Sequence, residues 1–552
     1  MRKQFSRTAA LVLAGAIAAG ALTGCGNGGK SNSGQTQAVS TETGSTDAGT
    51  SETTASVSED AGLHNLEDGV LDIGTGITWD TLTPLRSNIG NNAPFAMAAY
   101  ETLARLTENK EYVPQVAKSW VAGEDGKNFD VEIYDYVTDS AGNAITASDI
   151  VWMIKLQQEA ALKPAFAKVE SVEQTGDYTL RITMKKDMVG AFEAILTNTF
   201  VVSQKAYEES KDQFATEIIS TSPYKVTEFV SGSVLSFEKR DDYWQKPELI
   251  PEETAANVDK LSFHVIKEAS QAGIALETGD IDAFVQLDQN TAVQFVDNPA
   301  FSMEANSYIN GYQLYFSGGD NRNIATDENL RKAICYAIDT DGLIKGVFAG
   351  YGKSMHDPIA DTSVGYLEKW KDEEYYPYDV EKAKELIGQS NYKGEELEFL
   401  ATSSSTIQRV CQMIQGYLLQ VGINVKLNLV DQALYTATRL DGTQYDMTIN
   451  TVGGETLPDH WSIRYDYQAY KTGDATARHD EALGELLYKT WTKEGFTEEN
   501  IDEVHNYLKD HMYAYGMVQP ENIDVWRTDL GITKTVHTNK GSIDFTSCQY
   551  QE

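Results

Sequence analysis

Positive charge is scarce in this sequence of 552 residues, in which 45 lysine and arginine residues face 82 aspartate and glutamate residues for a net charge of −37. Nucleic acid is excluded as a partner, because its phosphates must be neutralised by basic side chains. A basic face drawn to anionic lipid headgroups is excluded for the same reason. Apolar residues make up 41% and aromatic residues 10% of the chain, which is too much for a disordered polyanion. The composition therefore predicts a large, acidic, folded protein of two to four domains.

Cysteine is rarer still, with only four residues at positions 25, 335, 411 and 548. This wide spacing matches neither a CxxC metal or redox pattern nor the disulfide framework of a small secreted domain. Cys335 and Cys411 fall on apolar stripes with helical spacing, so we expect them to be buried free thiols. The sequence also lacks a repeat of 20–50 residues, which excludes a solenoid or a propeller.

The first 25 residues have the features of a bacterial export signal. A positively charged start is followed by an uncharged apolar stretch over residues 8–22, which is shorter than the ~20 residues that a membrane-spanning helix needs. The stretch ends in Leu-Thr-Gly-Cys at residues 22–25, which resembles the lipobox of bacterial lipoproteins. That resemblance implies cleavage before Cys25 and diacylglycerol on its thiol. The alternative is an ordinary signal peptide with a chance cysteine.

The segment that follows is poor in apolar residues. From residue 26 to about residue 60 the chain consists of Gly, Ser, Thr, Ala and Gln with a few acids and no aromatic residue. Such a segment cannot bury enough surface to fold, and it predicts a flexible tether. We therefore expect an extracytoplasmic protein that is anchored to the cell membrane, on the outer face of the cytoplasmic membrane or in the periplasm.

Strand and helix patterns alternate from about residue 66 onward. The clearest stretch predicts strands at 397–401, 423–429 and 445–452, with helices between them at 407–418 and 431–440. Short connections in a β-α-β-α-β series are typical of an open α/β sheet. Earlier in the chain, apolar spacing predicts strands at 129–133 and 178–184 and helices at 95–106 and from residue 147.

Ligands of open α/β sheets bind beyond the carboxyl ends of the strands. Three places meet this rule. Trp79 ends a Gly-Ile-Thr-Trp sequence that follows a strand predicted at 70–73. Ser403 and Ser404 open a helix whose free N–H groups favour an anion. Glu455 follows two glycines after the strand predicted at 445–452. An ordinary turn or helix cap is the alternative at each place.

Enzyme motifs are present only in broken form. Residues 222–225 read Ser-Pro-Tyr-Lys, an SxxK match, but the residues after them read as a strand, so Lys225 would not lie one helical turn from Ser222. Residues 346–354 miss the phosphate-binding loop by one extra residue between the glycines. HExxH and GxSxG are absent. We therefore expect no enzyme, no catalytic residue, no cofactor and no metal site.

Several sequence blocks, each weak alone, together resemble one family. The blocks are Tyr-Glu-Thr-Leu at 100–103, Val-Pro-Gln-Val-Ala-Lys-Ser-Trp at 113–120, Ser-Pro-Tyr-Lys-Val at 222–226 and Asp-Tyr-Trp at 242–244, with further blocks at 124–129, 145–151, 276–282, 329–339 and 422–423. In this order they resemble the extracytoplasmic solute-binding proteins of peptide-type ABC transporters, the oligopeptide, dipeptide and nickel family 5.

The resemblance implies a two-lobed α/β fold of the periplasmic-binding-protein type II, with an extra domain inserted in the N-terminal lobe. The implied division is a signal peptide at 1–24, lipidated Cys25 and a linker at 25–65, lobe I at 66–110, 222–310 and 520–552, the extra domain at 111–221, and lobe II at 311–519. A monomer would trap its ligand between the lobes by hinge closure. A membrane permease would then accept the ligand.

The resemblance also implies a ligand class and a set of contacts. Peptide binders of the family carry an aspartate that holds the peptide amine where this chain has Glu455 in Glu-Thr-Leu-Pro-Asp-His. The leading hypothesis is thus a receptor for an oligopeptide or dipeptide. An oligosaccharide or metal-complex receptor is the alternative, and a serine acyl-enzyme using Ser222 is a distant one. The predicted contacts are Glu455 for a cation or amine, Ser403 and Ser404 for anionic or polar groups, and Trp79, Tyr100 and Trp461 as aromatic walls.

Overall fold

The computed structural model describes residues 61–85, 95, 98–107, 110–307, 311–319, 321–452, 456–466, 480–538 and 541–551. The chain separates into two units, Met1–Ser51 and Glu52–Glu552, and every described residue belongs to the second. The predicted export signal and Cys25 therefore lie outside the described residues, as does the tether. None of the helices in the described part combines the length and the apolar character needed to cross a lipid bilayer.

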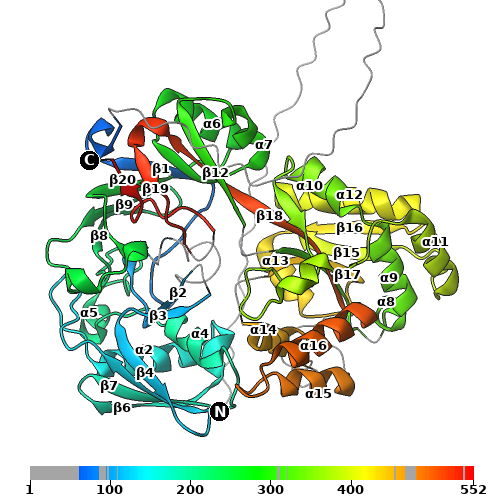
Figure 1. Ribbon diagram of the computed structural model, residues 1–552, viewed down its shortest axis with the longest axis horizontal. Helices are drawn as coiled ribbons and strands as arrows, with labels where there is room; N and C mark the ends of the chain where they lie inside the picture. Colours follow the sequence, from blue (N-terminus) through cyan, green and yellow to red (C-terminus); the bar gives the residue numbers. More distant parts are fainter. Residues whose placement is uncertain are drawn as a thin grey trace, which may run out of the picture. The chain divides into compact units, whose positions relative to one another are not determined.

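One long strand, β18 (Ala514–Arg527), connects two halves of a 12-stranded sheet (Figure 1). It pairs in antiparallel fashion with β11 (Ala283–Leu287) and β12 (Phe301–Ser307) in the first half. Further toward its start it pairs with β13 (Gly311–Phe316) and β14 (Gly352–Ser354) in the second half. Almost every residue of β18 is buried, as expected for a strand that is covered on both faces.

The first sheet half is built from segments that lie far apart in the sequence. At its centre β1 (Leu71–Thr75) runs parallel to both β10 (Lys260–Val265) and β11. The sheet then continues antiparallel through β9 (Val234–Lys239) to β8 (Tyr224–Val230). The other elements here are α6 (Ala269–Thr278), α7 (Gln289–Ala292), η5 (Val293–Phe295), and the pair β19 (Ile532–Lys534) and β20 (Gln549–Tyr550).

A separate antiparallel sheet lies between β1 and β8 in the sequence. Its order is β4 (Ala117–Ala122), β5 (Asn128–Ile133), β7 (Thr179–Met184) and β6 (Val169–Gly176), preceded by the hairpin β2 (Ala104–Leu106) and β3 (Tyr112–Pro114). Its helices are α2 (Ala147–Ala160), α3 (Pro164–Ala167), α4 (Ala191–Asn198) and α5 (Gln204–Glu209). Helix α2 begins with a capping box formed by Thr146 and Asp149, which satisfies N–H groups that the first turn leaves free.

The second sheet half has the order β16-β15-β17-β13 before it reaches β18. Strand β15 (Leu397–Thr402) runs parallel to β16 (Val425–Val430) and β17 (Met447–Val452). Its helices are α8 (Asn323–Thr326), α9 (Glu328–Ala337), α10 (Thr340–Val347), α11 (Val380–Gln389), α12 (Ser405–Gln420) and α13 (Gln432–Arg439). A helical group with its own apolar core follows, formed by α14 (Leu457–Arg464), α15 (Glu481–Lys489) and α16 (Glu498–His511).

The predicted β-α-β-α-β series over residues 397–452 is confirmed by β15, α12, β16, α13 and β17. The expected helix over 95–106 is wrong in its second part, where the chain forms β2. The apolar spacing of so short a segment fits a strand as well as a helix, and pairing of β2 with β3 decides between them.

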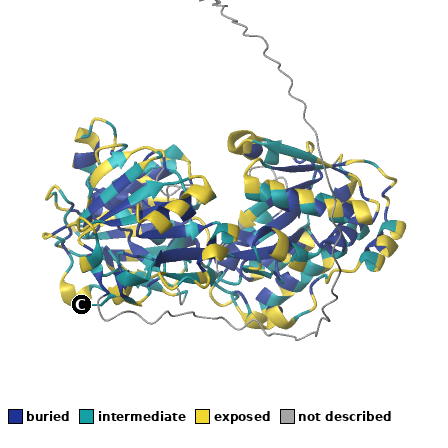
Figure 2. Ribbon diagram, turned by 90° about the horizontal axis from the view of Figure 1, so that it is seen from above, coloured by how far each residue is buried: buried dark blue, intermediate teal, exposed yellow. Residues whose placement is uncertain are grey.

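Figure 2 shows buried residues along the strands and exposed ones on the outer faces of the helices. Cys335 and Cys411 are buried free thiols, as predicted.

The geometry around Ser222 does not support the serine acyl-enzyme. Ser222 is only 2% exposed, and its hydroxyl donates to the carbonyl of Ala98 at 2.7 Å. Lys225 lies on strand β8 and forms an ion pair with Glu238 at 3.0 Å. Because the two side chains serve different contacts, no nucleophile and base are brought together here.

Candidate functional site

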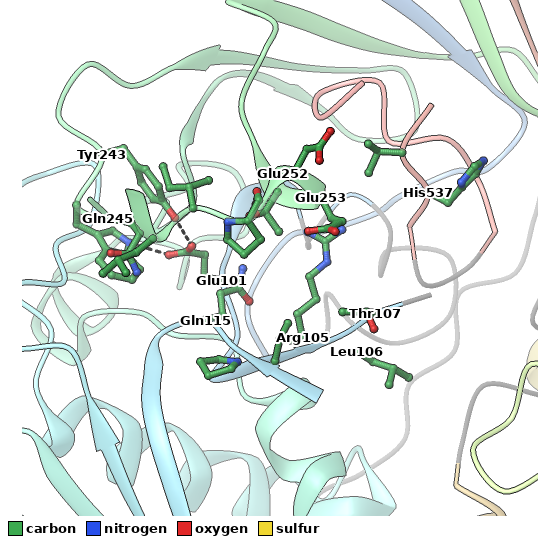
Figure 3. A pocket seen from close by; sticks show the side chains of 18 of the residues that line it. Glu101, Arg105, Leu106, Thr107, Gln115, Tyr243, Gln245, Glu252, Glu253 and His537 are labelled. Carbon is green, nitrogen blue, oxygen red and sulfur yellow. Dashed lines mark hydrogen bonds between the residues drawn. The ribbon is translucent and has the colours of Figure 1, made fainter. Parts of the chain in front are cut away.

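Two adjoining cavities lie beside the first sheet half, with volumes of about 270 and about 150 Å³. Five residues line both cavities: Glu101, Arg105, Gln115, Tyr243 and Thr254. We call the two together the paired cavity; Figure 3 shows the larger one. The walls of the larger cavity include the β2–β3 hairpin, the segment after β9 and the segment near the C-terminus, which are distant in sequence.

The walls of the paired cavity combine apolar and aromatic surface with a few polar groups. The apolar and aromatic residues of the larger cavity include Val113, Tyr134, Trp244, Leu249 and Ile250. The smaller cavity is lined by Ile73, Ile77, Phe95, Phe263 and Val285, among others. Such a lining with a few convergent polar side chains is typical of small-molecule sites.

Glu101 is held at the boundary of the two cavities by two aromatic donors. Its side chain is 3% exposed. The Tyr243 hydroxyl donates to Glu101 Oε1 at 2.5 Å, and the Trp244 indole N–H donates to Oε2 at 2.7 Å. Burial raises the pKa of Glu101 to about 7, against the opposite effect of these two hydrogen bonds. The carboxyl group can thus change its charge near neutral pH, inside a cavity wall.

This raised pKa predicts a measurable pH dependence. At pH values between the ordinary pKa of a glutamate and about 7, Glu101 is protonated in the folded protein but ionised in the unfolded chain. The folded state therefore loses stability relative to the unfolded state as the pH rises through this range. Glu101→Gln mimics the protonated form. Relative to this variant, wild-type protein should lose about 3 kcal/mol of unfolding free energy between pH 4.5 and pH 8. Denaturant unfolding at a series of pH values measures the difference, and parallel pH profiles for the two proteins would contradict it.

Arg105 is the cationic residue common to both cavities. It lies on β2, directly opposite Val113 of β3, and its side chain is 16% exposed. The nearest carboxylate is that of Asp544, with Nη2 and Oδ2 3.8 Å apart. In Figure 3 the Arg105 side chain extends from β2 toward the segment that carries Glu252 and Glu253.

Three other charged residues of the larger cavity, Glu252, Lys534 and His537, form ion pairs. Lys534 Nζ lies 2.7 Å from Glu252 Oε1. His537 Nε2 lies 2.9 Å from Glu304 Oε1. These pairs fix the C-terminal segment against the cavity wall. No group of three or more His, Cys, Asp or Glu side chains able to hold a metal ion occurs among the residues with described positions.

Of the predicted contact residues, Tyr100 lines the paired cavity, in its smaller part. Its ring packs against Phe200 with centroids 5.6 Å apart, and the side chain is 1% exposed. Burial raises the pKa of its hydroxyl well above the ordinary value. Within the described part of the chain this hydroxyl has no hydrogen-bond partner.

The structure places the other two predicted aromatic residues in apolar cores. Trp79 packs against Phe95, with ring centroids 4.5 Å apart. Trp461, on α14, belongs to the core of the helical group. Both side chains are buried, and neither indole N–H finds a partner among the described residues. Neither residue lines the paired cavity, and their role as aromatic walls stays a prediction.

Ser403 and Ser404 lie at the carboxyl end of β15, where the sequence predicted them, and both are exposed. Ser404 is the N-cap residue of α12, yet in the described structure its side chain makes no capping hydrogen bond. The two hydroxyls do not line the paired cavity. Glu455 lies outside the described residues. The proposed contacts of all three stay predictions.

The sequence interpretation missed Glu101, Arg105 and Tyr243. Glu101 and Tyr243 stand in the Tyr-Glu-Thr-Leu and Asp-Tyr-Trp blocks, but these blocks served only to recognise a family. A glutamate between two apolar stretches is a signal that could have been followed, because carboxylates are seldom fully buried unless they are paired. Glu101 and Tyr243 meet in one wall although more than 140 residues separate them in the sequence.

The comparisons with known proteins agree with this architecture. Residues 111–474, more than half of the chain, match "Bacterial extracellular solute-binding proteins, family 5 Middle". The glutathione-binding protein GsiB of Pectobacterium atrosepticum is 24% identical over 374 residues, which cover 65% of this chain and 69% of that protein.

Solved structures share the fold at low sequence identity. DppA from Helicobacter pylori in complex with the peptide STSA has a TM-score of 0.72 at 20% identity, covering 88% of this chain and 98% of that one. NikA from Brucella suis in complex with Fe(III)-EDTA has a TM-score of 0.72 at 20% identity, covering 87% of this chain and 100% of that one. The predicted two-lobed α/β binding-protein fold is thereby confirmed.

A match over this length shows the family directly. The family consists of binding proteins, which agrees with the prediction that this chain is not an enzyme. The chain belongs to family 5 of the bacterial extracellular solute-binding proteins.

Proposed function

We propose that this protein is a lipid-anchored receptor that captures an oligopeptide or dipeptide between two lobes and delivers it to the permease of an ABC transporter. Family membership is the observation that carries the receptor role. The predicted lipobox at Cys25 supports the membrane anchor, since the two acyl chains of a diacylglycerol anchor stably where one would be marginal.

The arrangement of strands and cores supports hinge closure. Strand β18 contributes to both sheet halves, so one continuous element joins the lobes. One apolar core consists of residues between Leu314 and Val518. A second core consists of residues from two other parts of the chain, Leu71 to Val285 and Trp526 to Cys548. We therefore retain the division into lobe I at 66–110, 222–310 and 520–552, the extra domain at 111–221 and lobe II at 311–519 as a proposal.

A peptide ligand is favoured over the alternatives by two features. DppA, which shares the fold, was solved with a peptide, and the sequence keeps an acid, Glu455, where peptide binders of the family hold an amine. A metal complex is the second candidate, because NikA from Brucella suis was solved with Fe(III)-EDTA. An oligosaccharide is a third candidate, which the sequence suggested through Trp79 and Trp461 as stacking surfaces. Both tryptophans are buried in apolar cores, so this candidate has the weakest support.

Calorimetric titration of the purified protein tests the ligand class. We expect saturable heat with at least one member of a set of di- to hexapeptides, and a rise in melting temperature in its presence, because a ligand that binds only the folded state stabilises it. Nickel-histidine and a set of oligosaccharides serve as controls. Binding of a control and of none of the peptides would contradict the proposed ligand class while leaving the receptor role intact.

A further inference from the structure

Arg105 is a mostly buried cation to which the described part of the chain gives no hydrogen bond. Among the described residues its ion pair is the 3.8 Å contact to Asp544, and its side chain is 16% exposed. Across the described residues the guanidinium takes part in no hydrogen bond at all. The contrast with buried Arg240 is direct, since Arg240 donates to the carbonyls of Ser220 and Asp139 at 3.3 and 2.9 Å.

Two of the acids that line the paired cavity with Arg105, Asp544 and Glu101, already accept hydrogen bonds from other donors. Asp544 Oδ1 accepts from the Thr546 hydroxyl at 2.5 Å, and Asp544 Oδ2 accepts from the Ser547 hydroxyl at 3.3 Å. Glu101 accepts from Tyr243 and Trp244, as described above. These carboxylates therefore do not complete the coordination of the guanidinium.

A guanidinium carries five N–H donors in a planar fork, and removing it from water is costly unless an anion or several acceptors replace the water. The fork matches the two oxygens of a carboxylate. The protein has a net charge of −37, a field that repels anions, so an anionic ligand group needs a local cation of this kind.

We propose that Arg105 binds a carboxylate of the transported ligand, at the junction of the two parts of the paired cavity. This inference rests on the proposed receptor function and deepens it, because it names a free carboxylate as a required group of the ligand. Strand pairing between β2 and β3 holds the backbone of Arg105 in place. The rest of the ligand would extend into the larger cavity, along its aromatic wall.

The experiment compares free-acid peptides with their C-terminal amides. The full-length protein is incubated with an equimolar pool of uncharged-side-chain di- to hexapeptides in both forms, and native mass spectrometry identifies the bound species. We expect the free acids to bind at least about tenfold more tightly than the amides, the size of effect that a charge-assisted bidentate contact gives. Arg105→Met should lose this preference together with the affinity, and Arg105→Lys should keep part of it.

Stability provides the second readout. Since Arg105 makes no hydrogen bond in the structure, Arg105→Met without ligand should melt no lower than wild type, and a clear drop would show a structural role and overturn the inference. Arg181→Met is the matched control, because Arg181 on β7 forms an exposed ion pair with Asp130 on β5 and its replacement should leave binding unchanged. Equal binding of acids and amides, or unchanged binding by Arg105→Met, would overturn the inference alone. Binding of neither set would overturn it together with the proposed peptide ligand.

Discussion

Replacing Arg331 by methionine is expected to lower the free energy of unfolding by about 4 kcal/mol. Arg331 lies on α9 and is 3% exposed. Its guanidinium donates to four backbone carbonyls, those of Ile324, Ala325, His511 and Met512, at 2.8–3.1 Å. The side chain, on α9, thus ties helix α8 to the end of α16. Methionine fills a similar volume but removes all four of these hydrogen bonds.

The matched comparison for Arg331→Met is the same substitution at Arg181. Arg181 forms its ion pair with Asp130 at a surface position, with side chains 44% and 57% exposed, and surface pairs contribute little. We expect Arg181→Met to destabilise the protein far less than Arg331→Met. Urea unfolding followed by circular dichroism measures both losses. Equal losses for the two variants would show that the four carbonyls of the Arg331 site find other donors.

Replacing Gly516 by alanine is expected to cost about 3 kcal/mol, the upper part of the range for overpacking a core. Gly516 lies on β18, and a Cβ atom there would collide with the backbone carbonyl of Asp357. That carbonyl cannot move freely, because the buried Asp357 carboxylate contacts His505 Nδ1 at 2.5 Å. The Gly516 N–H is also held, donating to the Tyr375 hydroxyl at 3.2 Å. Alanine must therefore shift backbone on one side or the other.

The same substitution at Gly416 should act in the opposite direction. Gly416 is an exposed residue inside α12, and a Cβ atom there would meet no neighbour within 4 Å. Alanine in a helix interior is favoured over glycine by roughly 0.5–1 kcal/mol. Thermal unfolding of the two variants beside wild type separates the steric effect at β18 from the general effect of alanine. A stabilised Gly516→Ala variant would refute the close packing described for this strand.

Local patterns predicted the second sheet half well. Strand β15 has apolar residues at the alternating positions 397, 399 and 401, and α12 has apolar residues at helical spacing. Gly422 after α12 adopts a φ of 88°. That left-handed conformation is easiest for glycine, which is why the residue ends the helix in sequence as well as in structure. Each of these signals is contained within about twenty residues.

The candidate site could not be predicted in the same way. Arg105 and Asp544 are separated by more than four hundred residues, and Glu101 and Tyr243 by 142. A sequence shows a charged residue but not whether it is buried, since burial depends on which distant segments pack around it. The misassigned helix over 95–106 has the same origin, because only the partner strand β3 selects a strand for residues 104–106.

The sequence by itself determined the class of this protein. The excess of acids excluded nucleic acid, the broken motifs argued against an enzyme, and ordered blocks indicated the solute-binding family, all from properties that are local or summed over the chain. Only the tertiary structure decided where a ligand could bind. It assembled the paired cavity from the β2–β3 hairpin, the segment after β9 and the C-terminal segment, among others, and within the described residues it gives Arg105 no hydrogen bond. The physical reason is that the pKa of a carboxyl group and the needs of a buried cation depend on surroundings that only folding creates.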